Sequence, residues 1–499
     1  MTSPGEKVWL GVVGITFAAF MAVLDVQIVN TSLNDIAGSL GASPQKASWL
    51  MTAYLTAEVA SIPLMVFFVQ RFGLRNTAVG VIALFAGFSL ACAQAWNFPS
   101  MIAFRAFQGL SGGTMVPLAL IGIMSLLPKE KQSIGMSLFA IAATFAPTLG
   151  PALGGWLTEH HGWRWIFYIN LIPSILLVMA VSSGIKSTNH PAEQENSHID
   201  KIGILILLPA LAALEVFLEE GNSYGWFDTP WITAAGIIAI TGLIGFYLYE
   251  SRTENPLVNL ALLRIPSAHF CYWAIFGLGM ALYGSIFLIT QYHANVQGFP
   301  PLQIAHILLW MGLPQLIILP LMPRLMKILP VELSIIVGFL FFLTGTLMST
   351  PLTVDFAGEY FYLNQVIRAI GQPFIFVPLS LVVTRHIPAS DVVSASILVD
   401  IFLAIGGTTG IALLSILLER AKDHNYHEIS EASVAHTYFD QLPAHTLIEM
   451  ADKQSSIIAY SQGFWLISAF VVFAMICVAL SWLSSQHALN KQKALTAPG

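Results

Sequence analysis

Long apolar runs constrain this chain more than any other feature of its sequence. A helix needs about 20 mostly apolar residues to cross the hydrocarbon core of a bilayer, and fourteen stretches come close to that requirement. The predicted spans are 8–30, 47–69, 77–96, 100–126, 133–157, 165–184, 202–218, 231–249, 269–291, 303–326, 332–349, 359–384, 393–419 and 461–484. We therefore expect an all-α, polytopic bundle of 14 transmembrane helices embedded in a lipid bilayer.

The composition supports a membrane location and argues against a soluble globule. Hydrophobic residues make up 56% of the chain and charged residues only 10%, whereas charged residues average about 25% of a soluble protein. The net charge of -6 and the lack of a basic tract disfavour nucleic acid as a partner. Two spans are less regular than the others, because 202–218 is short and 303–326 contains Pro314, Pro320 and Pro323.

The distribution of the 21 lysines and arginines predicts the orientation of the bundle. Fourteen spans place 14 of these residues on one side of the membrane, five on the other side and two inside spans. Since cytoplasmic loops carry the excess of positive charge, both termini are expected in the cytoplasm. The apolar run after Lys7 continues into Asp25 and Asn30 without a small-residue cleavage site, which indicates a retained span and not a secretory signal.

Polar stretches divide the chain into three predicted parts. These are an N-terminal six-helix half at 1–184, a linker with two additional helices at 185–268, and a C-terminal six-helix half at 269–499. The polar segment 187–201 is expected to link the halves. The longest non-membrane stretch, 420–460, is expected to form an external loop before the last span.

Histidines and cysteines give little indication of a metal site. The predicted loop contains four histidines, His424, His427, His436 and His445. Their spacing does not repeat as metal ligands usually do, so a solvated or partner-contacting loop is favoured over a metal centre. The three cysteines are Cys92, Cys271 and Cys477. All three lie in apolar runs, which favours packing over a disulfide framework.

An internal repeat relates the two halves. Span four reads RAFQGLSGGTMVPLAL from Arg105, and span twelve reads RAIGQPFIFVPLSL from Arg368. A proline opens the next loop in both halves, and a helix glycine follows 22 residues later. The matching pairs are Arg105 with Arg368, Pro128 with Pro388, and Gly150 with Gly410. Two pseudo-symmetric halves are the layout of many secondary transporters.

Ionisable side chains inside spans are candidates for function, because each costs about 2.5 to 3.5 kcal/mol to insert. They are Asp25, Glu58, Arg105, Arg368 and Asp400. We expect Asp25, Glu58 and Arg105 to meet in one cavity of the first half and to couple transport to protons. Burial raises the pKa of a carboxyl group and a nearby cation lowers it, so an acid under both influences can bind and release a proton in the physiological range. The alternative is that Asp25 and Arg105 form a fixed ion pair that ties two spans together.

The second half offers the same choice of interpretations. Arg368 in span twelve and Asp400 in span thirteen are either functional groups or a structural ion pair. The sequence leaves both readings open.

Span five contains the run APTLGPALGG, in which small residues alternate with prolines. The residues of interest are Pro147, Gly150, Pro151, Gly154 and Gly155. Small residues four apart let two helix backbones approach closely, and proline removes a backbone donor and kinks a helix. The pattern favours a deformable gating helix, with simple packing as the alternative.

The sequence lacks the motifs of ATP-driven pumps, of zinc proteases and of redox enzymes with paired cysteines. It contains no GxxxxGK[ST], HExxH or paired CxxC. We therefore expect no enzymatic activity, cofactor or metal, and an ion gradient as the energy source.

The motifs of spans one, two, four and five, and the segment leading into span six, resemble those of the major facilitator superfamily, and in particular its fourteen-span drug:proton antiporters of the EmrB/QacA type. The matching segments are LDVQIVNTSL at 24–33, WLMTAYL at 49–55, RAFQG at 105–109, APTLGPALGGWL from 146 and WRWIFYINLIP at 163–173. The resemblance implies that Asp25 couples proton and substrate, that Arg105 takes part in proton transfer, and that the span-five run is the antiporter signature. It also implies a periplasmic adaptor and an outer-membrane channel as partners, and hence a Gram-negative inner membrane.

The chain departs from the family pattern at two places. The cytoplasmic loop between spans two and three keeps Arg71, Gly73 and Arg75, but has Val66 and Gln70 where the family usually has Gly and Asp. In span thirteen Asp400 stands where an amide is expected. An additional acid facing the cavity would either favour cationic substrates or bind a second proton.

The leading interpretation is therefore a proton-driven exporter of amphipathic drugs or toxic compounds that works by alternating access. Its cavity is expected to have aromatic and aliphatic walls, which suit broad specificity. One alternative is a dedicated exporter of a metabolite such as a fatty acid or siderophore. A second is a membrane sensor or scaffold without transport, against which the embedded acids argue.

Overall fold

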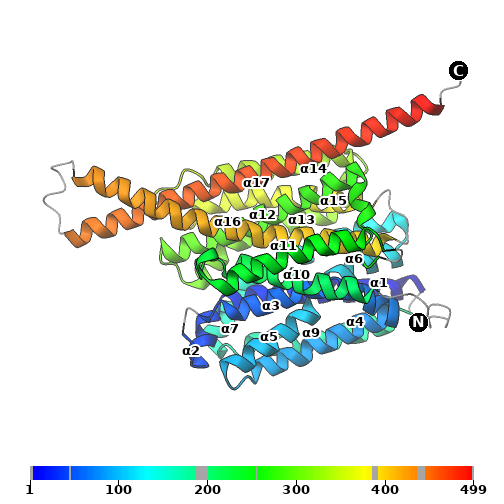
Figure 1. Cartoon of the computed structure of the whole chain (residues 1–499), viewed down its shortest axis with the longest axis horizontal. Coiled ribbons are helices and arrows are strands. Elements are labelled where there is room, and N and C mark those ends of the chain that lie inside the picture. Colours follow the sequence, from blue (N-terminus) through cyan, green and yellow to red (C-terminus); the bar gives the residue numbers. More distant parts are fainter. Residues whose placement is uncertain are drawn as a thin grey trace.

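A bundle of long helices makes up this protein in the computed structural model, which describes residues 4–43, 46–186, 200–253, 256–384, 391–434 and 444–496. Within these ranges every regular element is a helix, and the long helices run alongside one another (Figure 1). The predicted all-α fold is confirmed.

Nine helices form the first part of the bundle. They are α1 (Pro4–Asn30), α2 (Leu33–Ser39), α3 (Trp49–Ser61), α4 (Leu64–Ala93), α5 (Phe98–Gly112), α6 (Met115–Leu126), α7 (Lys129–His161), α8 (Trp165–Tyr168) and α9 (Leu171–Gly184), counted over the described residues. Two further helices, α10 (Lys201–Glu220) and α11 (Pro230–Glu250), follow the segment predicted as a linker.

The remaining helices form the opposite side of the bundle. They are α12 (Pro266–Asn295), α13 (Pro301–Leu325), α14 (Val331–Leu347), α15 (Tyr360–Thr384), α16 (Val392–Val434) and α17 (Ala444–Thr496). In Figure 1 the blue and cyan helices lie along one side and the yellow to red helices along the other, with the green α10 and α11 across the middle.

Twelve helices of the described chain are long and apolar enough to cross a membrane. The shorter apolar helix α14 and the divided second span, in which α3 ends at Ser61 and α4 begins at Leu64, make this count compatible with fourteen spans. The irregular span with three prolines is nevertheless one helix, α13. Neighbouring helices and local adjustments can satisfy the backbone groups that prolines free within a membrane bundle.

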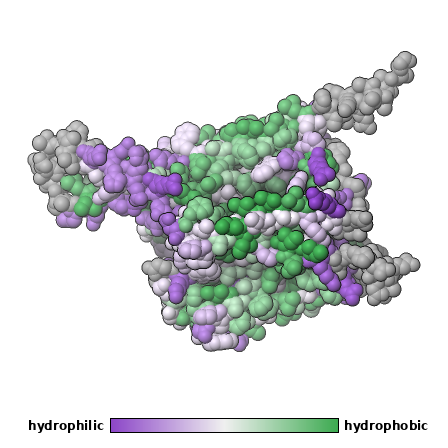
Figure 2. All heavy atoms as spheres, in the orientation of Figure 1, coloured by the Kyte–Doolittle hydropathy of each residue, from purple (hydrophilic) through white to green (hydrophobic). Residues whose placement is uncertain are grey.

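The sides of the bundle are apolar, as contact with lipid requires. Figure 2 shows hydrophobic side chains over most of the visible side of the bundle and hydrophilic ones toward its ends. Large side chains such as Ile172 and Leu205 are about three-quarters exposed, at 73% and 74%. Because exposed apolar surface on this scale is disfavoured in water, the protein is a multi-pass membrane protein.

The expectation of a loop at 420–460 is wrong for the described part of this segment, which is helical. Helix α16 continues to Val434, α17 begins at Ala444, and the two extend together beyond the bundle (Figure 1). Extending an existing helix adds one hydrogen bond for each residue fixed, and an ion pair of 2.8 Å joins Lys422 to Asp452 across the pair. His436 lies outside the described residues, and no group of three potential metal ligands occurs within them.

The two sides of the bundle repeat the same packing. Helix α1 packs against α7 and α9, and α12 packs in the same way against α16 and α17. A methyl group added at Gly150 of α7 would overlap Gln27 of α1, and one added at Gly410 of α16 would lie 2.7 Å from the backbone of Met280 in α12. The glycines that the sequence repeat matched therefore occupy corresponding positions.

Candidate functional site

A fully buried ion pair links α1 and α5. Arg105 Nη1 lies 2.7 Å from Asp25 Oδ2, and neither side chain is exposed. The guanidinium also lies over the ring of Tyr54 in α3, 4.2 Å from its centroid. Since removing one member of a buried ion pair leaves the other charge uncompensated, these two residues depend on one another.

Amide and hydroxyl groups complete the surroundings of this pair. Asp25 Oδ1 accepts hydrogen bonds from Asn170 Nδ2 at 2.6 Å and from Gln108 Nε2 at 3.1 Å. Both amides also donate to Ser89 Oγ, at 2.9 and 3.3 Å. The network joins α1, α4 and α5 to the residue that precedes α9, and it supports the alternative in which the pair ties spans together.

Sequence reasoning did not single out the polar partners of the ion pair. Signals were nevertheless present, since Gln108 lies within the RAFQG motif and Asn170 within WRWIFYINLIP. Gln108 follows Arg105 by three residues and so shares its helix face. Ser89 has no such signal, because nothing in an apolar run marks one serine as buried against another span.

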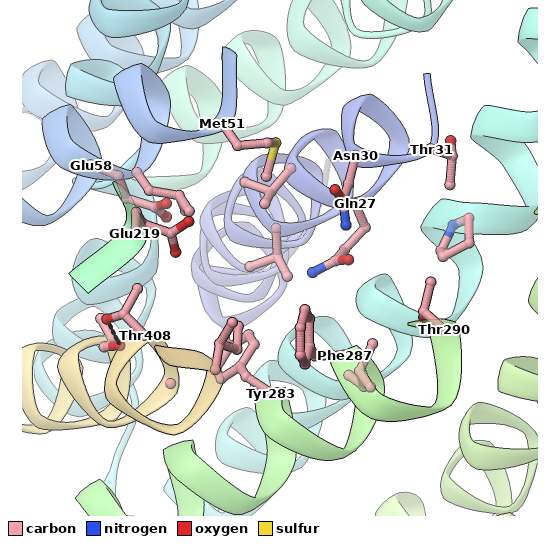
Figure 3. Close-up of a pocket in the computed structure, with 18 of the residues that line it drawn as sticks. Gln27, Asn30, Thr31, Met51, Glu58, Glu219, Tyr283, Phe287, Thr290 and Thr408 are labelled. Carbon is pink, nitrogen blue, oxygen red and sulfur yellow. Dashed lines mark hydrogen bonds between the residues drawn. The ribbon is translucent and has the colours of Figure 1, made fainter. Parts of the chain in front are cut away.

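A cavity of about 720 Å³ lies between the two sides of the bundle. Helices α1, α3, α7 and α10 line it together with α12 and α16, and Figure 3 shows several of these side chains pointing into it. Glu58 of α3 is one of the lining residues, whereas Asp25 and Arg105 are not.

The expectation that Asp25, Glu58 and Arg105 share one cavity is therefore wrong. On α1 the cavity is lined by Val23, Gln27 and other residues of that face. Asp25 is two residues from each of these, which at about 100° per residue turns it to the opposite side of the helix. The ion pair thus lies behind α1, and Glu58 alone of the three faces the cavity.

Four carboxylates line the cavity, and no Lys, Arg or His of the described chain does. They are Glu58, Glu215, Glu219 and Asp400. Glu215 accepts a hydrogen bond of 3.3 Å from Thr408 Oγ1. Glu215 and Glu219, both on α10, were missed at the level of sequence, although a spacing of four residues in a span is a readable signal for one helix face.

The cavity is apolar at one end and polar at the other. Phe139 of α7 and Phe376 of α15 both line it, and their ring centroids are 5.7 Å apart, so they join the two sides of the bundle there. Asn34, Ser48 and Asn295 line it near the other helix ends, close to α2 and to the end of α12. The expected aromatic and aliphatic walls are present.

The glycines of span five bring α7 close to α1. A methyl group at Gly154 would lie 2.6 Å from the carbonyl oxygen of Ile28, whereas one at Gly155 would find ordinary contacts, the nearest 3.6 Å away on Pro301 of α13. Pro147 and Pro151 lie inside the helix. The close contact between Gly154 and Ile28 supports the packing interpretation, while gating by α7 stays a prediction.

The loop motif between spans two and three contains a backbone turn. Gly73 has φ of +76° inside the stretch assigned to α4, a conformation that side chains with a Cβ rarely adopt. Arg71 is exposed and Arg75 is partly exposed on either side of this turn.

Arg368 and Asp400 do not form the structural ion pair considered from the sequence. Arg368 is fully buried in α15 and donates to Gln365, and Gly345 of α14 packs against its side chain. Its Nε and Nη1 have no hydrogen-bond partner in the described part of the chain. Asp400 instead lines the cavity. The two residues lie on different helices whose faces point to different neighbours, which the separate sequence positions could not reveal.

A helical membrane bundle that holds a cavity between two similarly packed sides is the architecture of a transporter. The family model described as Major Facilitator Superfamily matches residues 15–411. The chain belongs to this superfamily.

Similar proteins extend over most of the chain. It is 29% identical to the colistin resistance protein EmrB of Acinetobacter baumannii, covering 83% of this chain and 81% of that protein. It is 27% identical to the multidrug export protein EmrB of Haemophilus influenzae, with 93% of each covered, and 27% identical to the fatty acid resistance protein FarB of Neisseria gonorrhoeae, with 83% and 81% covered. The human organic anion transporter MFSD10 shares the fold, with a TM-score of 0.57 at 15% identity over 94% of this chain and all of that one.

Proposed function

We propose that this protein is a secondary transporter that exports amphipathic drugs or toxic compounds across the inner membrane in exchange for protons. The observation that carries the proposal is a cavity of about 720 Å³ with aromatic walls and buried carboxylates, adjacent to a buried Asp25–Arg105 pair. The names of the similar multidrug export proteins support the same activity. Such a cavity suits a substrate that is largely apolar with a few polar groups.

Alternating access would arise from rocking of the halves 1–184 and 269–499 about the cavity. The positive-inside bias puts the Phe139–Phe376 contact toward the cytoplasm and the polar end of the cavity toward the outside. In this arrangement both termini lie in the cytoplasm and the structure is open outward. Protons would then enter while the substrate leaves.

The buried pair is suited to the proton step. A proton on Asp25 removes the charge that holds Arg105, so the contact between α1 and α5 weakens when the acid is protonated. Glu58, which faces the cavity, would bind protons from the cavity and release them into it. The proton thus biases the packing of α1, and α1 in turn contacts the glycine-rich face of α7.

The extension of α16 and α17 is the proposed place for a periplasmic adaptor that leads to an outer-membrane channel. Under the proposed orientation it projects away from the membrane on the external side. Figure 2 shows its described part as largely hydrophilic, as expected for a surface that meets water and another protein.

A dedicated exporter of a fatty acid remains a second candidate, because one relative is named a fatty acid resistance protein. The cavity favours the first candidate, since four carboxylates and no basic residue of the described chain line it. Like charges would oppose a fatty-acid anion there.

Proteoliposomes under an imposed pH gradient test the proposal. Wild-type protein is expected to move ethidium against its concentration gradient, and Asp25→Asn is expected to abolish the response to the pH gradient. Asp35 is an exposed residue of α2, so Asp35→Asn is the control for replacing an aspartate by asparagine. Undiminished proton-driven transport by Asp25→Asn would refute the assigned proton site.

A further inference from the structure

The second half of the bundle holds a fully buried arginine outside the cavity. Arg368 of α15 has no exposed surface and is not one of the residues that line the cavity. Its guanidinium carbon lies 5.9 Å from the ring centroid of Phe342 in α14, and a methyl group added at Gly345 of α14 would lie 2.5 Å from its Cγ. Helix α14 therefore packs directly against this side chain and limits where it can move.

The polar groups at the end of this side chain include more donors than acceptors. Arg368 Nη2 donates to Gln365 Oε1, one turn earlier on the same helix. Because arginine can only donate, this bond fixes the amide of Gln365 with its oxygen toward the guanidinium. The buried Nε and Nη1 of Arg368 and Nε2 of Gln365 have no hydrogen-bond partner in the described part of the chain. These three nitrogens belong to two groups that are hydrogen-bonded to one another, so they lie together.

The charge of Arg368 needs a counterion that the described part of the chain does not supply. None of the ion pairs found there includes Arg368, whereas Arg105 of the first half has the carboxylate of Asp25. A buried carboxylate can take up a proton and become neutral, but arginine keeps its charge in proteins. An unpaired buried charge is strongly destabilising. The complete burial of both side chains favours a single small ion over an organic acid or a lipid headgroup.

We infer that Arg368 and Gln365 form a binding site for a small monovalent anion, of which chloride is the abundant example. The anion accepts hydrogen bonds from Nε and Nη1 of the arginine and from Nε2 of the amide. It thereby takes the role that the carboxylate of Asp25 has beside Arg105 in the first half. The inference is independent of the proposed function, because the site lies outside the cavity and contains neither Asp25 nor Glu58.

Thermal unfolding of the purified protein in detergent tests the inference. Replacing sodium gluconate with sodium chloride at equal ionic strength is expected to raise the unfolding temperature of the wild type by about 2 °C or more, because gluconate is too large for the site. Arg368→Met is expected to lose this response. Gln365→Glu supplies a carboxylate beside the arginine, so it is also expected to lose the response, with an unfolding temperature in gluconate at or above that of the wild type.

Arg252→Met removes an exposed arginine after α11 and is the control for the loss of one positive charge. It should respond to chloride as the wild type does. Anomalous scattering from wild-type crystals grown in bromide needs no variant and is expected to show a bromide ion beside the guanidinium of Arg368. Equal unfolding temperatures of the wild type in the two salts would overturn the inference, as would a chloride response that Arg368→Met retains or a bromide map without a peak at that position.

Discussion

Arg105 and Arg368 occupy matching positions in the sequence repeat, yet their surroundings differ. Arg105 has a carboxylate partner in Asp25, whereas Arg368 donates to Gln365 and has two nitrogens without a partner among the residues that the structure describes. The glycine contacts explain this difference. Because Gly150 meets Gln27 and Gly410 meets Met280, the position that corresponds to Asp25 on α12 is the buried Leu278.

The comparison suggests that the two halves share a scaffold and divide the chemistry. The first half holds a buried ion pair behind α1, where we propose that the proton step takes place. Among the described residues, the second half has no such buried pair, and its acid Asp400 lines the cavity instead. A repeated backbone can therefore carry different charges, because each buried charge depends only on its immediate neighbours.

The largest contrast is expected from removing each arginine in turn. Arg105→Met leaves Asp25 buried without its cation and should lower the free energy of unfolding by about 3 to 5 kcal/mol. Arg368→Met removes a charge without a carboxylate partner and should change it by less than about 1.5 kcal/mol. Unfolding of the two purified variants in detergent measures both values. Equal losses of unfolding free energy would show that the carboxylate partner of Arg105 makes no difference to stability.

The glycine contacts offer a second test, in which the halves should behave alike. Gly150→Ala and Gly410→Ala each add a methyl group against a neighbouring helix and should cost about 1 to 3 kcal/mol of stability. Gly155→Ala is the control, since its added methyl group has ordinary contacts and alanine favours a helix over glycine. If Gly150→Ala were as stable as Gly155→Ala, the close approach of α1 and α7 would not be required.

The smallest effect is expected outside the bundle, in the extension of α16 and α17. Lys422→Ala removes an ion pair whose side chains are 42% and 53% exposed, and exposed pairs contribute about 0 to 1 kcal/mol. The temperature of unfolding should barely change, and added salt should remove any difference from wild type. A loss as large as that of Arg105→Met would mean that exposed and buried pairs matter equally here.

Several site features could be read from the sequence, and others could not. Asp25 and Arg105 were recognised as candidate residues because ions inside apolar spans are rare, and their ion pair was considered as an alternative to a shared cavity with Glu58. Glu215 and Glu219 were missed because their span was treated only as a short, weak one. The supposed pairing of Arg368 with Asp400 failed because nothing local to either residue indicates which way its helix faces.

The sequence by itself determined the all-helical class, the position of most apolar helices, the repeat and the presence of Asp25 and Arg105 as ionisable groups within spans. These follow from length, hydropathy and spacing, which are local properties of the chain. Only the tertiary structure decided that Asp25 turns away from the cavity, that α10 joins its wall and that α16 and α17 continue beyond the bundle. The rotation of each helix depends on contacts with helices distant in sequence, and no local pattern contains them.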